Sequence, residues 1–260
     1  MSTLLKIVSL NLRMHNRGDG INEFPNRKNR IKDFIDSSDA DIIGFQEIMP
    51  HMREWLVESF PDYYMVGIGR GKKYDDETAL IAFRKDKMSL ISCDTVMLST
   101  TPSVFGSVYD GSDQSHCPRE YVKVFLKHRD IDEPFWVYNV HTDHIGEMAR
   151  VLASAQIMQD ITAHGKKVFF TGDFNATPDA LSIKMIRENS TRPLVDATPS
   201  ENTFHGFGRK SVSATPGGEK IDYIFADADT KVVSNEIYAD IPVDGVYISD
   251  HYPVIAVFEV

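Results

Sequence analysis

Residues 168–178 read V-F-F-T-G-D-F-N-A-T-P, an apolar run that stops at a glycine and continues with polar residues. The run is typical of a buried strand, and Gly172 and Pro178 punctuate the turn that follows it. Asp173 and Asn175 therefore stand directly behind a buried strand, where a charged or polar side chain is costly unless it is paired or binds a ligand. Gly-Asp-x-Asn alone is also an ordinary structural turn, so its meaning depends on the rest of the chain.

The same pattern of an apolar run bordered by a polar residue recurs along the sequence. Each case has an ordinary explanation of its own: a histidine on an apolar strand is often a core residue, and an acid behind a strand often meets solvent or caps a turn. Together these explanations require several unrelated coincidences. The residues that stand at such strand ends, or on such a strand, are Asn11, Glu47, His141, Asp173, Asn175, Asp222, Asp250 and His251.

The order of apolar runs and helical patterns predicts the architecture. We expect strands at 5–12, 41–47, 63–69, 78–84, 90–98, 120–127, 134–141, 168–171, 221–226 and 254–260, and helices at 27–36, around Met52–Leu56 and at 148–161. Many strands with few helices favour two sheets packed face to face with helices outside, a layered α/β sandwich. No linker or repeat is visible, so residues 1–260 are expected to form a single domain. The long loops at 101–119 and 205–218 are expected to shape specificity.

Composition limits the function. The formal net charge is −10, which disfavours broad binding of nucleic acid, because such binding relies on many lysine and arginine contacts to phosphate. The N-terminal residues show no secretory leader, and no apolar stretch is long enough to span a membrane, so a cytoplasmic protein without a membrane anchor is expected. Cys93 and Cys117 are expected to be free thiols. Residues 67–73 (G-I-G-R-G-K-K) fit no phosphate-loop pattern and are interpreted as a mobile surface loop.

The residue types at the strand ends indicate a metal site. Carboxylate and amide oxygens without cysteine ligands favour a hard cation, Mg²⁺ first and Mn²⁺ as an alternative. Acidic ligands together with two histidines are what metal-assisted hydrolysis of a phosphate ester needs, because the cation neutralises the phosphate while a general base activates water.

Six motifs in order give the chain a family resemblance. They are S-L-N-L (9–12), G-F-Q-E (44–47), N-V-H-T-D-H (139–144), G-D-F-N-A-T-P (172–178), K-I-D-Y-I-F (220–225) and S-D-H-Y-P-V (249–254). In this set the sequence resembles the endonuclease/exonuclease/phosphatase superfamily, and the 139–144 stretch is similar to that of its bacterial, deadenylase-like branch. The resemblance implies the deoxyribonuclease I-like fold, a four-layered sandwich of two mixed β-sheets packed face to face and flanked by helices.

The resemblance also implies a role for each position. Glu47 would be the principal metal ligand, helped by Asn11 and Asp250. Asp173 and Asn175 would orient the attacking water, hold a second metal or contact the phosphate. His251, oriented by Asp222, would contact the scissile phosphate or act as base, and His141 would stabilise the developing charge. Further candidates are Glu77, which would orient His141, and the substrate-binding residues Arg119, Asp143 and His144; the last two could instead shape the pocket or cap the following helix.

These observations favour an enzyme that hydrolyses a phosphodiester or phosphomonoester by metal-activated water, with a small ester preferred over duplex DNA. A nuclease acting on RNA or single-stranded DNA is the alternative within the same chemistry. A non-catalytic binding module of the same fold and a phospholipid head-group phosphodiesterase are the alternatives from other classes. No obligate protein partner is evident; the expected partner is a phosphate-ester substrate, which includes nucleic acid.

Overall fold

The computed structural model describes residues 3–209 and 219–260, and its strands form two six-stranded sheets. The first sheet has the order β11 (Lys231–Ile237), β12 (Val254–Glu259), β1 (Leu4–Asn11), β2 (Ile42–Gln46), β4 (Ile81–Arg84), β3 (Tyr63–Val66). The second has the order β5 (Met88–Met97), β6 (Glu120–His128), β7 (Phe135–His141), β8 (Val168–Asp173), β10 (Asp222–Asp227), β9 (Leu194–Asp196). Both sheets are mixed, because β1 and β2 run parallel, as do β7 and β8, while the other neighbours are antiparallel.

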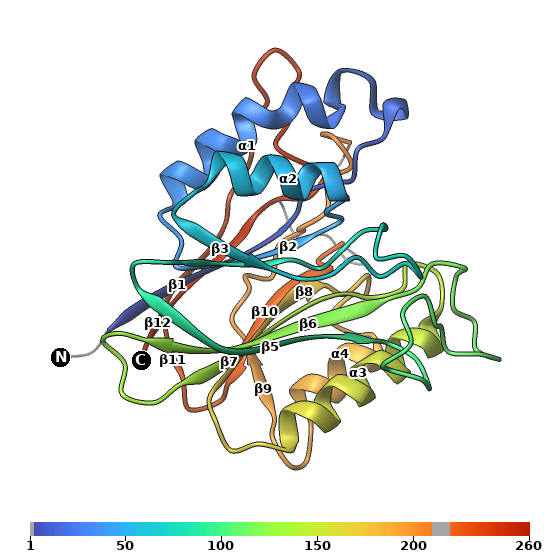
Figure 1. Ribbon diagram of the computed structural model, residues 1–260, viewed down its shortest axis with the longest axis vertical. Helices are drawn as coiled ribbons and strands as arrows, with labels where there is room; N and C mark the ends of the chain where they lie inside the picture. The colour runs from blue at the N-terminus through green and yellow to red at the C-terminus, as the bar shows by residue number, and fades with distance from the viewer. Residues whose placement is uncertain (1–2, 210–218) are drawn as a thin grey trace.

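Helices cover the outer face of each sheet, which gives four layers (Figure 1). Helices α1 (Phe24–Ser38) and α2 (Pro50–Ser59) pack on the first sheet, and α3 (Glu147–Thr162) and α4 (Leu181–Arg187) pack on the second. A short 3-10 helix, η1 (Arg17–Asn22), precedes α1. The expected four-layered sandwich of the deoxyribonuclease I type is therefore confirmed.

Strand alternation divides the apolar residues between the layers. In β2, Ile42 faces the core between the two sheets, whereas Ile43 faces the core beneath α1 and α2. In β8, Phe169 joins the central core and Phe170 joins the core beneath α3 and α4. Successive side chains of a strand point to opposite faces, so a strand covered on both sides has a continuous apolar sequence.

A polar contact joins the two sheets near one end of the central core. Gln46 Nε2 donates to Asn139 Oδ1 at 2.7 Å, and Thr171 Oγ1 donates to the same oxygen at 3.0 Å. Gly44 lies against this contact so closely that a Cβ on it would come within 2.1 Å of Thr171 Oγ1. The sheets therefore approach each other closely next to the strand ends that carry the polar residues.

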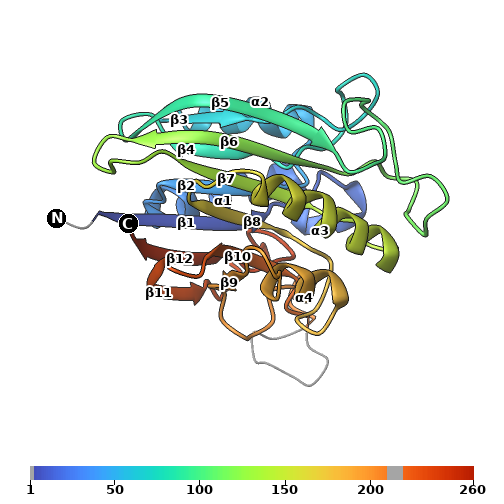
Figure 2. The ribbon, with the colours of Figure 1, turned by 90° about the horizontal axis from the view of Figure 1, so that it is seen from below.

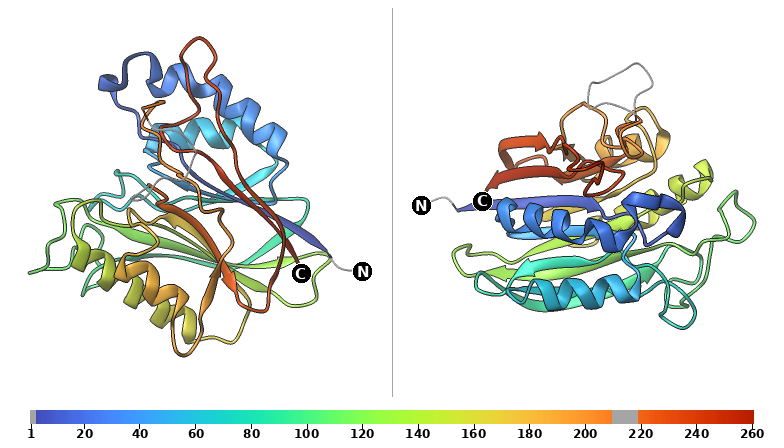
Figure 3. Two further views of the ribbon diagram at one scale, coloured as in Figure 1. Left: turned by 180° about the vertical axis from the view of Figure 1, so that it is seen from behind. Right: turned by 90° about the horizontal axis from the view of Figure 1, so that it is seen from above.

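The topology gathers the polar strand ends at one edge. The parallel strands β1, β2, β7 and β8 end there, while β10 and β12 begin there. The pairing places Asn11 opposite Gln46, and it places His141 and Asp222 on either side of Asp173. Both chain termini lie at the opposite end of the strands (Figures 2 and 3).

Most expected elements are present, with shifted ends. The strand expected at 63–69 ends at Val66, and the one expected at 78–84 begins at Ile81. Strands β9 and β11 and helix α4 were not expected. Residues 101–119 form a long connection between β5 and β6, and of the 205–218 loop the residues 210–218 lie outside the described part. Cys93 and Cys117 are both free, as expected.

Candidate active site

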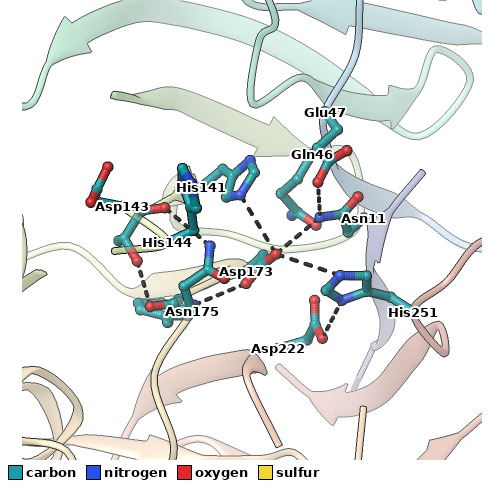
Figure 4. Close-up of polar contacts among 12 residues, drawn as sticks. Asn11, Gln46, Glu47, His141, Asp143, His144, Asp173, Asn175, Asp222 and His251 are labelled. Carbon is teal, nitrogen blue, oxygen red and sulfur yellow. Dashed lines mark hydrogen bonds and ion pairs between the residues drawn. The ribbon is translucent and has the colours of Figure 1, made fainter. Parts of the chain in front are cut away.

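The polar residues from the strand ends meet in one cluster; Figure 4 labels all of them except Asp250, which lines the same cavity. They come from strands of both sheets, so residues that are far apart in the sequence become neighbours. A cavity of about 370 Å³ opens between them and the loops at residues 67–77 and 117–119. The members of the cluster that line this cavity are Glu47, His141, Asp173, Asn175, Asp250 and His251.

His251 and Asp222 form a buried pair. His251 Nδ1 lies 2.9 Å from Asp222 Oδ2, and His251 Nε2 lies 3.8 Å from Asp173 Oδ2 on the other side of the ring. Burial alone would lower the pKa of His251, but the surrounding carboxylates, Asp222 foremost, outweigh it and raise the pKa to about 10. The histidine is therefore positively charged and is held in place by Asp222. Its other ring nitrogen, Nε2, is directed at the centre of the cluster (Figure 4).

Asp173 lies at the centre of the cluster. Its Oδ1 accepts from the backbone N–H of Asn175 at 2.9 Å, and its Oδ2 accepts from Asn11 Nδ2 at 2.9 Å. Burial, reinforced by the nearby charge of Asp222, raises the pKa of Asp173 to about 7. This carboxyl group can therefore exchange a proton near neutral pH.

Glu47 lies on the other side of Asn11. Its Oε2 accepts from the backbone N–H of Met14 at 2.8 Å, and its Oε1 accepts from Asn11 Nδ2 at 3.0 Å. Burial would raise the pKa of Glu47, but these hydrogen bonds outweigh it and hold the pKa below its usual range. The group is thus a permanent anion. Asp250, also buried, lies 3.8 Å from Arg13 Nε.

His141 lies between the centre of the cluster and its arginine-lined side. Its Nε2 is 3.6 Å from Asp173 Oδ2, and its Nδ1 is 3.9 Å from Glu77 Oε2. Burial, and after it the positive charge of Arg119, keeps the pKa of His141 well below its usual value, so the ring is neutral. Glu77 is near enough to influence the ring but too far for a hydrogen bond, and it pairs instead with Arg70 at 3.0 Å. Its orienting role stays a prediction.

The three predicted substrate-binding residues are placed differently from one another. Arg119 and His144 line the cavity, and Arg119 Nη2 donates to His144 Nδ1 at 2.8 Å. Asp143 lies behind them: its Oδ1 accepts from the backbone N–H groups of Ser115, Ile145 and Gly146. The geometry of Asp143 is that of a cap on the turn before α3.

Arg70 is a charged cavity-lining residue that the sequence did not indicate. The 67–73 stretch was expected to be a surface loop, which is wrong for Arg70, since that side chain is only 4% exposed and lines the cavity. Gly69 approaches the backbone so closely that a Cβ would lie 2.5 Å from the carbonyl oxygen of Asp76. The paired glycines around the arginine were the available signal, because they allow the loop to fold back on itself.

The donor set fits a hard divalent cation. Within the described residues, one group of acidic and histidine side chains has ligand atoms within 4.8 Å of one another: Asp173, Asp222 and His251. This differs from the predicted set of Glu47, Asn11 and Asp250. We favour the carboxylates of Glu47 and Asp173, because Asp222 is already hydrogen-bonded to a positively charged His251, which repels a cation. In the structure Asn11 Nδ2 bridges these two carboxylates with its own donor hydrogens.

Comparison with known proteins agrees with the fold. The sequence profile of the Endonuclease/Exonuclease/phosphatase family matches residues 8–251, and the chain belongs to this family. A solved endonuclease/exonuclease/phosphatase from Bacteroides vulgatus is 31% identical, with a TM-score of 0.90 over 99% of both chains. A mannosyl-6-phosphatase from Bacteroides thetaiotaomicron is 26% identical, with a TM-score of 0.85 over 98% of this chain and 99% of its own. The human Nocturnin catalytic domain, 16% identical with a TM-score of 0.73 over 99% of this chain and 97% of its own, shares the fold.

Members of this family are generally phosphoester hydrolases, and the expected superfamily is thereby confirmed. Among the described residues, no helix combines the length and apolar character needed to cross a membrane.

Proposed function

We propose that this chain hydrolyses a small phosphate ester with the help of a divalent cation, Mg²⁺ or Mn²⁺, by direct attack of water. One observation carries the proposal: two buried carboxylates joined by Asn11 (Glu47 and Asp173) and a positively charged histidine (His251, paired with Asp222) meet at one cavity. Metal binding needs the carboxylates, and stabilisation of phosphate charge needs the positively charged histidine.

Glu47 and Asp173 would hold the cation, with Asn11 and Asp250 beside them. When bound, a divalent cation neutralises phosphate charge and lowers the pKa of water near it. In hydrolysis the water oxygen bonds to phosphorus, the bond between phosphorus and the ester oxygen breaks, and the departing oxygen gains a proton. Asp173, with Asn175, orients the water, while His251 and His141 stabilise charge on the phosphate oxygens. Asp222 positions His251.

The size and charge of the site favour a small substrate. A cavity of about 370 Å³ is at the lower end of the range for small-molecule sites. The net charge of −10 disfavours a long polyanion. The similarity to a mannosyl-6-phosphatase supports a sugar phosphate or another phosphorylated metabolite as the substrate class. Because the site takes residues from Asn11 to His251, we also infer that residues 1–260 act as one domain.

The test is hydrolysis of p-nitrophenyl phosphate and bis-p-nitrophenyl phosphate with Mg²⁺, Mn²⁺ or EDTA. We expect turnover that requires the metal and that falls at least about 100-fold in Glu47→Ala and in His251→Ala. The matched controls are Glu58→Ala and His51→Ala, which remove the same residue types from exposed positions and should keep wild-type activity. Metal-independent turnover, or turnover that survives both site variants, would contradict the proposal.

A further inference from the structure

The cavity has a second, positively charged side that the chemistry above does not use. Arg70 and Arg119 line it, each only 4% exposed. They come from separate connections of the chain, the one between β3 and β4 and the one between β5 and β6. Two buried guanidinium groups at one wall of a small cavity are costly to maintain unless something with negative charge binds them.

The hydrogen-bond donors of both arginines are incompletely used. Among the described residues, no hydrogen-bond partner meets Nε of Arg70 or Nε and Nη1 of Arg119. Arg70 pairs with Glu77 through Nη2, and its Nε lies 3.8 Å from Asp76. Buried donors are nearly always satisfied in folded proteins, and the exceptions gather where a ligand is to bind.

The acid nearest to Arg119 does not fill this role. Arg119 Nε is 3.6 Å from Asp143 Oδ2, beyond hydrogen-bond length, because Asp143 is held by backbone N–H groups of its own turn and by the hydroxyl group of Ser115. The other donor of Arg119, Nη2, is directed at His144. An incoming anion would therefore find donors that the protein has left open.

The position of these donors relates them to the reacting centre. His141 separates the two, with Nε2 3.6 Å from Asp173 and Nδ1 3.9 Å from Glu77, the partner of Arg70. The arginine wall is thus one imidazole ring away from Asp173. An anion held there lies beside His141, which we expect to stabilise charge on the reacting phosphate.

We propose that Arg70 and Arg119 bind the terminal oxygens of a phosphate monoester dianion, so that this site is a phosphatase site and rejects phosphodiesters. The proposal rests on the function proposed above. A monoester presents three unsubstituted oxygens, enough for the carboxylate-and-metal side and for both arginines, which match phosphate with paired N–H groups. A diester would have to place its second organic group against open, buried guanidinium donors, which such a group cannot satisfy.

The preference for a monoester is tested with two substrates that have the same leaving group. They are p-nitrophenyl phosphate, a dianion at pH 8, and methyl p-nitrophenyl phosphate, a diester monoanion. We expect wild-type kcat/KM to be at least about 100-fold higher for the monoester. Arg119→Gln should lose about 100-fold on the monoester and less than about 5-fold on the diester, with Arg119→Lys in between. Arg129→Gln, at a side chain 61% exposed, is the charge-matched control and should match wild type. An equal loss on both esters, or a preference for the diester, would overturn the proposal.

Binding of inorganic phosphate tests the arginine subsite independently of the proposed hydrolytic function. Calorimetry on metal-free protein should show binding that weakens at least about tenfold in both Arg70→Gln and Arg119→Gln, with circular dichroism establishing that each variant is folded. If neither ester is hydrolysed with any metal but phosphate binding follows the arginines, the proposed function fails and the anion subsite stands. Equal affinity in wild type and both variants overturns the subsite.

Discussion

At the scale of single residues, the backbone of the site is held in an unusual conformation. Arg13, Glu47 and Asn175 have φ values of 52°, 62° and 45°, in the left-handed region that asparagine tolerates better than glutamate or arginine. Such a conformation costs about 1–3 kcal/mol at a residue other than glycine, so the surrounding packing must impose it. At Glu47 the turn comes immediately after β2 and directs the carboxylate toward Asn11 and the backbone of Met14.

A buried histidine near the site should make stability depend on pH. His205 is fully buried, stacks on Tyr252, and accepts from the backbone N–H of Gly208 through Nδ1. Burial, assisted by the positive charge of His251, lowers its pKa from the usual 6.5 to about 4. Between these values the unfolded chain binds a proton that the folded chain refuses, so His205 causes stability to fall as pH falls from about 6.5 to 4, by up to about 3 kcal/mol.

The measurement is urea unfolding of wild type and His205→Asn at several pH values, since an asparagine oxygen can replace Nδ1 as the acceptor. The difference in unfolding free energy between the two proteins should change with pH in this window, with wild type losing more toward pH 4. A difference that is constant from pH 7 to 4 would show that His205 is not responsible.

At the scale of elements, Arg27 of α1 forms hydrogen bonds with the segment that follows β1 and with the segment that precedes β12. It is completely buried and has no carboxylate in direct contact among the described residues; it donates to backbone carbonyls instead. Nη1 reaches Leu12 at 2.6 Å and Ile248 at 2.7 Å, and Nη2 reaches Arg13 at 2.6 Å. Burial lowers the pKa of Arg27 to about 10, which leaves it charged at neutral pH. One side chain therefore joins the segment after Asn11 to the segment before Asp250.

Replacing this side chain should weaken both the fold and the site. We expect Arg27→Met to lower the free energy of unfolding by about 3 kcal/mol or more, because several buried carbonyls lose their donors at once. Arg27→Lys should recover part of the loss. The exposed Arg17→Met is the control and should change stability by less than about 0.5 kcal/mol. Urea titrations with an unchanged m-value would measure this, and equal stability of Arg27→Met and Arg17→Met would refute it.

The elements that sequence reasoning found and those it missed differ in a physical way. Strands such as β2 and β8 are covered on both faces, so their apolar sequence marks them and the polar residue that ends them. The edge strand β11 is largely exposed and reads K-V-V-S-N-E-I, with too few buried positions to show a pattern. Helix α4 has seven residues, barely two turns of periodicity.

The same distinction explains the site. Asp173, His141 and Glu47 interrupt apolar strands and could be located from the sequence, whereas Arg70 lies in a loop whose burial depends on distant segments. The sequence therefore predicts the cavity residues that lie at strand ends and misses many of those that lie in loops.

At the scale of the whole molecule, the two sheets must remain in close contact for the site to exist. Gly44 provides this contact, since a Cβ there would meet Thr171 Oγ1 at 2.1 Å and Asn139 Oδ1 at 2.8 Å. Glu47 lies three residues beyond Gly44, and Asp173 lies two beyond Thr171. A wedge between the sheets would therefore separate the two carboxylates that we assign to the cation.

Gly44→Ala tests this coupling. We expect a loss of about 1–3 kcal/mol in stability from overpacking, together with weaker metal binding and lower activity in the protein that remains folded. Gly165→Ala is the control, because nothing lies within 4 Å of a Cβ at that position and its backbone is not left-handed. Calorimetric titration of Mg²⁺ or Mn²⁺ and thermal unfolding would measure both effects. If Gly44→Ala is as stable and binds metal as tightly as Gly165→Ala, the sheets are not coupled in this way.

The place of β12 between β1 and β11 has a consequence for synthesis on the ribosome. All strands of the second sheet precede β12 in the chain and can assemble before it is made, but β1 must wait for β12, which follows about 240 residues later, to fill its open edge. Asp250 and His251 immediately precede that strand. A nascent chain therefore carries Glu47, His141 and Asp173 without the histidine cation opposite them. We therefore expect the site to be complete only when β12 has formed, at the moment when the exposed edge of β1, which could pair with another chain until then, is closed.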